Sequence, residues 1–94
     1  MPAFTISCND KPNSLDLRMT TRPAHVAFLT GLGEAVRVAG PYLDDKGDMC
    51  GSLIVLEAVD IEAAKATAAQ DPYAKAGLFA SVEVRPYRLA IVRS

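Results

Sequence analysis

Residues 49–59 (MCGSLIVLEAV) form an almost unbroken apolar run, and this run limits how the chain can fold more than any other feature. Its length and content are typical of a buried β-strand bounded by turns. A strand with one wet side would alternate between apolar and polar residues. Residues 53–56 (LIVL) instead place apolar side chains on both faces, so the sheet that contains this strand needs cover on both sides.

The flanking segments predict further strands and helices around that run. Thr21-Arg22-Pro23 is expected to open a helix, because proline is tolerated in the first helical turn. Residues 9–20 before it read as a long loop. Gly40-Pro41 marks its strand as an edge strand or a bent one. In chain order the predicted strands are 3–8, 36–43, 49–59 and 82–92, with a helix opening at 21–23, a helix over 61–70 and a short helical turn over 71–77.

The order of these elements predicts an α+β fold of the ferredoxin-like βαββαβ type. The turn sequence at residues 44–48 (DDKGD) joins the middle two strands as a hairpin. The expected result is a four-stranded antiparallel sheet with two helices on one face. At 94 residues, the chain is predicted to be a single domain over residues 1–94.

Helices on one face would leave the other face of the sheet uncovered. A large exposed apolar patch is rare in soluble monomers. We therefore expect a homodimer that packs through the sheet. The alternative is that the C-terminal segment or the loop over 9–20 covers this face.

Composition excludes several classes of protein. Hydrophobic residues make up 50% and charged residues 22% of the chain, which is typical of a globular domain. A net charge of −1 and a pI of about 5.7 provide no basic surface for nucleic acid. No apolar stretch is long enough for a membrane span, and residues 1–4 do not resemble a signal peptide. We therefore expect a cytoplasmic protein with neither nucleic acid nor membrane as a partner.

His25 and Asp71 are the candidate catalytic pair. His25 is the one histidine of the chain and is expected in the first turn of a helix, where an imidazole tends to stay neutral and able to accept a proton. A carboxylate beside it would fix one tautomer. Each residue also has an ordinary interpretation, as a histidine at a helix surface and as an N-cap before Pro72.

Other residues are candidates for binding a ligand. Ser52 follows a glycine at the start of a strand and can donate a hydrogen bond to a ligand oxygen, although a strand-edge serine is more common. Arg22, Arg18 and Tyr73 can bind an anionic or phenolic ligand, but such residues are more often solvated or packing groups. Cys8 alternates with apolar residues and is expected to be a buried thiol.

Several well-known motifs are incomplete. Gly31-Leu32-Gly33 lacks the third glycine and the preceding strand of a dinucleotide fingerprint. Residues 47–52 lack the lysine of a P-loop, and residues 49–56 lack the aromatic residues with which RNA-recognition modules stack bases. The two cysteines have no CxxC spacing, so neither a metal site nor a redox motif is expected.

Taken together and in order, these segments resemble the YCII-related family over nearly the whole chain. The matching stretches are Asp10-Lys11-Pro12-Asn13-Ser14-Leu15, Arg22-Pro23-Ala24-His25, Ala39-Gly40-Pro41, Gly51-Ser52, Asp71-Pro72-Tyr73-Ala74-Lys75-Ala76-Gly77-Leu78 and Val82-Glu83-Val84-Arg85-Pro86-Tyr87.

The resemblance implies a dimer of the dimeric α/β barrel type with a pocket centred on a His–Asp pair, which falls on His25 and Asp71. It places the family's Gly-Ser position on Ser52, and Pro72, Tyr73 and Arg22 in the same pocket. It implies no metal or organic cofactor. Some members are thought to be lyases or dehalogenating enzymes that act on oxygenated aromatics.

Two functional hypotheses follow. In the first, the chain is a cofactor-independent enzyme in which Asp71 orients His25 as a general acid/base on a small polar or aromatic substrate. Elimination, isomerisation and hydrolysis remain open as reaction types. In the second, the same pocket binds a small molecule without turnover, as a regulatory dimeric module. A purely structural dimer would leave neither residue beside a cavity.

Overall fold

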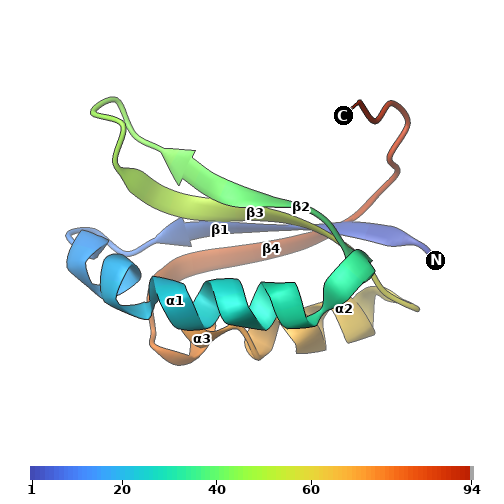
Figure 1. Ribbon diagram of the computed structural model, residues 1–94, viewed down its shortest axis with the longest axis horizontal. Helices are drawn as coiled ribbons and strands as arrows, with labels where there is room; N and C mark the ends of the chain where they lie inside the picture. The colour runs from blue at the N-terminus through green and yellow to red at the C-terminus, as the bar shows by residue number, and fades with distance from the viewer. Residues whose placement is uncertain (94) are drawn as a thin grey trace.

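The computed structural model describes residues 1–93 and arranges them as one four-stranded sheet with helices on one side (Figure 1). All neighbouring strands are antiparallel, in the order β2-β3-β1-β4. The predicted ferredoxin-like α+β fold is confirmed. Its elements are β1 (Ala3–Asp10), α1 (Leu15–Gly31), a 3-10 turn (Gly33–Ala35), β2 (Val36–Leu43), β3 (Met49–Glu57), α2 (Ile61–Ala69), α3 (Pro72–Lys75) and β4 (Phe79–Tyr87).

The core lies between the helices and the two central strands. Strand β3, the apolar run of the sequence, pairs with β1 on one side and β2 on the other. Alternate residues of β1 and β3 point toward the helices, as period-two geometry requires. The buried side chains of this core are Phe4, Ile6, Cys8, Ile54, Leu56, Ala58 and Ala64.

The other face of the sheet, which we call the outer face, is apolar over β2 and β3. Val55 is buried on this face, but Val38 and Tyr42 keep 51% and 36% of their surface exposed. The C-terminal segment does not cover them, since its Ile91 and Val92 are themselves 76% and 62% exposed. Association of two copies through this face stays a prediction.

Helix α1 begins earlier than predicted. It starts at Leu15, so Thr21 is not its N-cap and the second half of the loop predicted over 9–20 is helical. Pro23 lies inside the helix, where a missing N–H and ring crowding cost about 3 kcal/mol. Buried contacts on both sides of the proline, at Arg18 and His25, offset this cost.

The early start of α1 moves His25 to the middle of the helix. The prediction that it lies in the first turn, under the influence of the helix N-terminus, is therefore wrong, because that influence fades within one turn. The first turns of α1, coloured blue, lie at an angle to the rest of the helix in Figure 1, which is the expected effect of Pro23.

The last strand is shifted toward the N-terminus relative to its prediction over 82–92. Strand β4 ends at Tyr87, whose partner Ala3 is the first residue of β1. Beyond Tyr87 the chain has no strand to pair with, so its apolar residues 89–92 leave the sheet despite their β propensity. Within residues 1–93, no helix is both long and apolar enough to cross a bilayer.

Gly51 lies where a side chain would not fit. An added Cβ would clash with the backbone oxygen of Cys8 and lie 3.0 Å from the ring of Tyr42. Tyr42 crosses the outer face at this point, and its hydroxyl hydrogen-bonds the hydroxyl of Ser7 at 2.9 Å. The glycine therefore permits close contact between three strands beside Ser52.

We predict that Gly51→Ala lowers the free energy of unfolding by about 1–3 kcal/mol, because backbone atoms cannot move aside freely. Urea denaturation measures the change. Gly31→Ala is the matched control: nothing lies within 4 Å of its new Cβ, and alanine favours the helix by up to about 1 kcal/mol. Equal stability of the two variants would contradict the prediction.

We also predict that the native chain sediments as a dimer. Val38→Glu on the outer face should yield a monomer, because association would bury an unpaired charge. Val59→Glu, at a position that is 71% exposed between β3 and α2, should leave the dimer intact. A native monomer in sedimentation velocity would end this prediction.

Candidate active site

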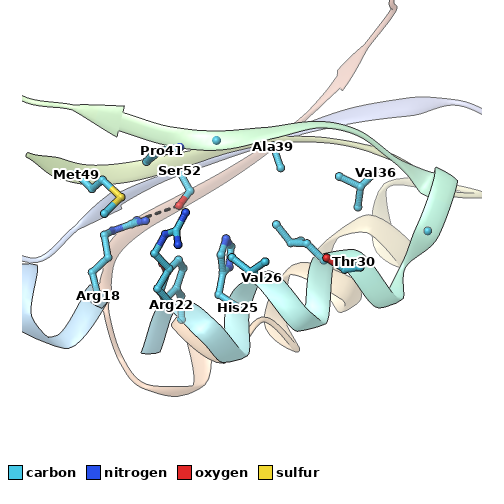
Figure 2. Close-up of a pocket in the computed structure, with 14 residues that line it drawn as sticks. Arg18, Arg22, His25, Val26, Thr30, Val36, Ala39, Pro41, Met49 and Ser52 are labelled. Carbon is cyan, nitrogen blue, oxygen red and sulfur yellow. Dashed lines mark hydrogen bonds between the residues drawn. The ribbon is translucent and has the colours of Figure 1, made fainter. Parts of the chain in front are cut away.

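A cleft of about 480 Å³ opens between α1 and the β2–β3 side of the sheet (Figure 2). Its helical wall carries Arg18, Arg22 and His25, strand β3 adds Ser52, and edge strand β2 supplies small and apolar groups opposite the helix. The lining residues are Arg18, Arg22, His25, Val26, Leu29, Thr30, Gly33, Val36, Ala39, Gly40, Pro41, Met49, Ser52 and Tyr73.

The structure brings His25 and Asp71 together from distant parts of the chain. Nδ1 of His25 lies 2.9 Å from both carboxylate oxygens of Asp71. Asp71 is also the N-cap of α3, where Oδ1 accepts the backbone N–H of Tyr73 at 2.9 Å. The capping role and the imidazole contact expected of this carboxylate therefore occur together.

Burial gives the two groups different access to the cleft. Asp71 is 3% exposed and does not line the cleft, whereas His25 lines it. An ionised carboxylate only accepts hydrogen bonds, so the imidazole donates from Nδ1, and in the neutral form of the ring the lone pair is then on Nε2. Figure 2 shows the His25 ring extending from α1 toward the sheet. The arrangement leaves Nε2 for proton exchange with a ligand.

Tyr73 packs between the histidine and an arginine. Its ring stacks on His25 with centroids 3.9 Å apart and 19° between the planes. The guanidinium carbon of Arg18 lies 4.5 Å from the centre of the same ring. Burial raises the pKa of the Tyr73 hydroxyl, and the charges of Arg18 and Arg22 offset part of that rise. The phenol therefore stays protonated at neutral pH.

Arg18 forms a buried ion pair that sequence reasoning missed. Its Nε and Nη2 donate to the two carboxylate oxygens of Asp10 at 2.6 and 2.8 Å, and Nη2 also donates to Ser52 Oγ at 2.9 Å (dashed in Figure 2). Burial by itself would lower the pKa of Arg18, but the hydrogen bonds and charge of Asp10 raise it. The sequence does not predict this pair, because the spacing of Arg18 from Asp10 carries no recognisable signal.

The predicted ligand-binding residues divide into two groups. Arg22, Ser52 and Tyr73 line the cleft. Pro72 does not, and instead occupies the first position of α3, next to Asp71. In this position its fixed φ supports the helix start rather than a ligand.

The remaining candidates for chemistry are less favourably placed. Burial, with a smaller contribution from the charge of Asp71, raises the pKa of the Cys8 thiol to about 12, so this cysteine is no nucleophile at neutral pH. Within residues 1–93, no three side chains of the His, Cys, Asp and Glu types cluster as metal ligands would.

Fold and cleft together define a ferredoxin-like α+β domain in which a histidine bound to a buried carboxylate borders a ligand-sized space. The YCII-related domain matches residues 3–88, and the chain belongs to the YCII-related family.

The relatives of this chain include named and uncharacterised proteins. Protein YciI of Escherichia coli O6:H1 is 38% identical over 93 residues, with 90% of this chain and 95% of the relative covered. An uncharacterised protein of Haemophilus influenzae is 37% identical with the same coverage. A 5-chloro-2-hydroxyhydroquinone dehydrochlorinase from Burkholderia phenoliruptrix AC1100, solved with 2,5-dihydroxybenzoquinone, is 35% identical, with a TM-score of 0.84 and coverage of 92% of this chain and 93% of that one.

We predict that Asp71→Ala lowers the free energy of unfolding by about 2–4 kcal/mol, since it removes both a cap and a buried hydrogen bond. Asp60→Ala is the matched control: it removes a cap from α2 and no histidine contact, for about 1 kcal/mol. Chemical denaturation measures both. If the two substitutions cost the same, the His25 contact contributes nothing to stability.

Proposed function

We propose that this protein is a cofactor-independent enzyme that eliminates a small leaving group, such as halide, from an oxygenated aromatic ring. The observation that carries the proposal is the His25–Asp71 contact at the wall of the cleft: one imidazole nitrogen is bound to a buried carboxylate while the ring borders the open space. The relation to a dehydrochlorinase of known substrate supports the reaction class.

In this proposal His25 is the general acid/base and Asp71 its orienting partner. Asp71 accepts from Nδ1, which keeps Nε2 basic and stabilises the imidazolium that forms when a proton is taken up. The stacked ring of Tyr73 holds the imidazole in its plane. Both restraints come from α3, so the short helix acts as the support of the base.

The chemistry balances without an external oxidant. His25 takes a proton from a ring hydroxyl and returns it to the carbon that carries the halogen, which leaves a carbonyl at the former hydroxyl. Loss of a second hydroxyl proton to His25 then expels the halide with the electron pair of the carbon–halogen bond. The substrate loses one hydrogen halide in total, and the imidazolium releases its proton to solvent.

The walls of the cleft suit such a ring. Val26, Leu29, Val36 and Met49 offer apolar contact to its faces, in a volume of about 480 Å³ that accommodates a single ring. Ser52 supplies a hydroxyl for the oxygen that gains negative charge during proton transfer.

The test is chloride release from 5-chloro-2-hydroxyhydroquinone and a panel of halogenated hydroquinones. The native chain should release chloride, and His25→Ala should lower kcat by about 10²–10⁴-fold, the usual contribution of positioned proton transfer. Asp71→Asn should lower kcat less, because the imidazole remains although its carboxylate partner is lost.

A folded His25→Ala variant with native turnover would contradict the role of the histidine. Circular dichroism and thermal unfolding establish that the variant is folded. A thermal-shift screen against a metabolite library extends the search to other ring substituents. Compounds that are bound by the native chain without turnover would instead favour a ligand-binding module.

A further inference from the structure

The Ser52 hydroxyl has a defined direction. Arg18 Nη2 lies 2.9 Å from Ser52 Oγ, and a guanidinium carries donors but no acceptor. Oγ must therefore accept this bond, which leaves the hydroxyl proton for another partner. Within residues 1–93 the Ser52 side chain has no second hydrogen bond, and the residue lines the cleft. The free proton is thus available to a ligand.

Arg18 is itself fixed in place. The guanidinium donates two hydrogen bonds to the carboxylate of Asp10 in β1, at 2.6 and 2.8 Å, and Arg18 is 1% exposed. The guanidinium carbon also lies over the ring of Tyr73. A fixed cation beside Oγ both orients the hydroxyl and makes its proton a stronger donor.

The charges at the cleft are unbalanced. Among the residues that line it there is no Asp or Glu. Asp10, which does not line the cleft, neutralises the charge of Arg18. Within residues 1–93, no carboxylate lies within ion-pair distance of Arg22. Figure 2 shows Arg22 extending from α1 toward the region where Ser52 points down from β3. The carboxylate of Asp71 lies behind His25 and does not line the cleft, so the charge that faces the space beside the Ser52 hydroxyl is that of the Arg22 guanidinium.

We propose that this end of the cleft is a subsite for an ionised oxygen, and that the ligand is an acidic single-ring compound, such as a hydroxyquinone or phenolate. Ser52 donates a hydrogen bond to that oxygen, Arg22 supplies the compensating charge, and Arg18 is a positioning residue held by Asp10. The subsite rests on the proposed function for its placement next to His25. The preference of the subsite for a negatively charged oxygen follows from the residues that form the subsite.

Binding of 2,5-dihydroxybenzoquinone, an acidic ring, tests the subsite by calorimetry without any need for turnover. Neutral hydroquinone is the comparison probe. The native chain should prefer the acidic ring, and Ser52→Ala and Arg22→Gln should each weaken its binding by about 10-fold to 100-fold, the usual effect of losing a hydrogen bond to a charged group. Binding of hydroquinone should change much less.

Lys65→Gln is the matched control for net charge. Lys65 is an exposed cation on α2, remote from the cleft lining, so its loss should leave affinity unchanged. Equal binding of both rings, native affinity in Ser52→Ala and Arg22→Gln, or no binding of the acidic ring by the native chain would each overturn the proposal.

Testing whether Arg18 positions Ser52 requires a measurement that would not change if Arg18 only stabilised the fold. Arg18→Lys keeps the charge but loses the fork that reaches Asp10 and Ser52 together. It should weaken binding of the acidic ring in the native background and have little further effect in Ser52→Ala, a coupling measured by a double-mutant cycle. Additive losses would assign Arg18 a separate role. Asp10→Asn replaces Arg18→Lys in the same cycle if the lysine variant does not fold.

The proposed subsite and the proposed reaction can be disproved independently of each other. His25→Ala should lose turnover while it keeps most of its affinity for the acidic ring. Affinity that survives in Ser52→Ala and Arg22→Gln, together with turnover that depends on His25, would reject the subsite and leave the reaction standing.

Discussion

One buried carboxylate connects the parts on which the site depends. Asp71 begins α3 by accepting a backbone N–H, and through its other contacts it binds the imidazole of α1. Helices α1 and α3 lie far apart in the sequence, and neither has a large hydrophobic core of its own. Because an unpaired carboxylate would be costly at this depth, the contact restrains both helices against each other. The orientation of His25 is thus a consequence of the same interaction that stabilises the helix pair.

The sheet was predictable because its determinants are local. The apolar run of β3 and the turn at residues 44–48 define a hairpin, and the alternation of β1 supplies its neighbour. The proline in β2 marked an edge strand, and β2 is one. Asp71 and Pro72 marked a helix start, which α3 confirms. Each of these signals depends on a few consecutive residues and on backbone chemistry alone.

The errors arose where contacts between distant residues override local preference. In the sequence, Pro23 predicts the start of a helix, yet α1 continues through it because Arg18 and His25 are buried on either side. The Asp10–Arg18 pair could not be read from the sequence at all, since the two residues meet only when β1 and α1 fold together. Removing one member of such a buried pair typically costs about 3–5 kcal/mol, so this long-range contact outweighs a single local signal. The pairing of His25 with Asp71 was expected from family resemblance more than from spacing.

Because β2 is an edge strand, the residues that line the cleft on this side differ from the buried residues of the core. Ala39, Gly40 and Pro41 form one wall of the cleft but stay exposed and contribute nothing to the buried core. Substitutions there can reshape the space available to a ligand while the packing beneath β1 and β3 remains intact. The shape of the cleft can therefore change in this scaffold by drift along one strand, with the His25–Asp71 contact and the stability of the domain left unchanged.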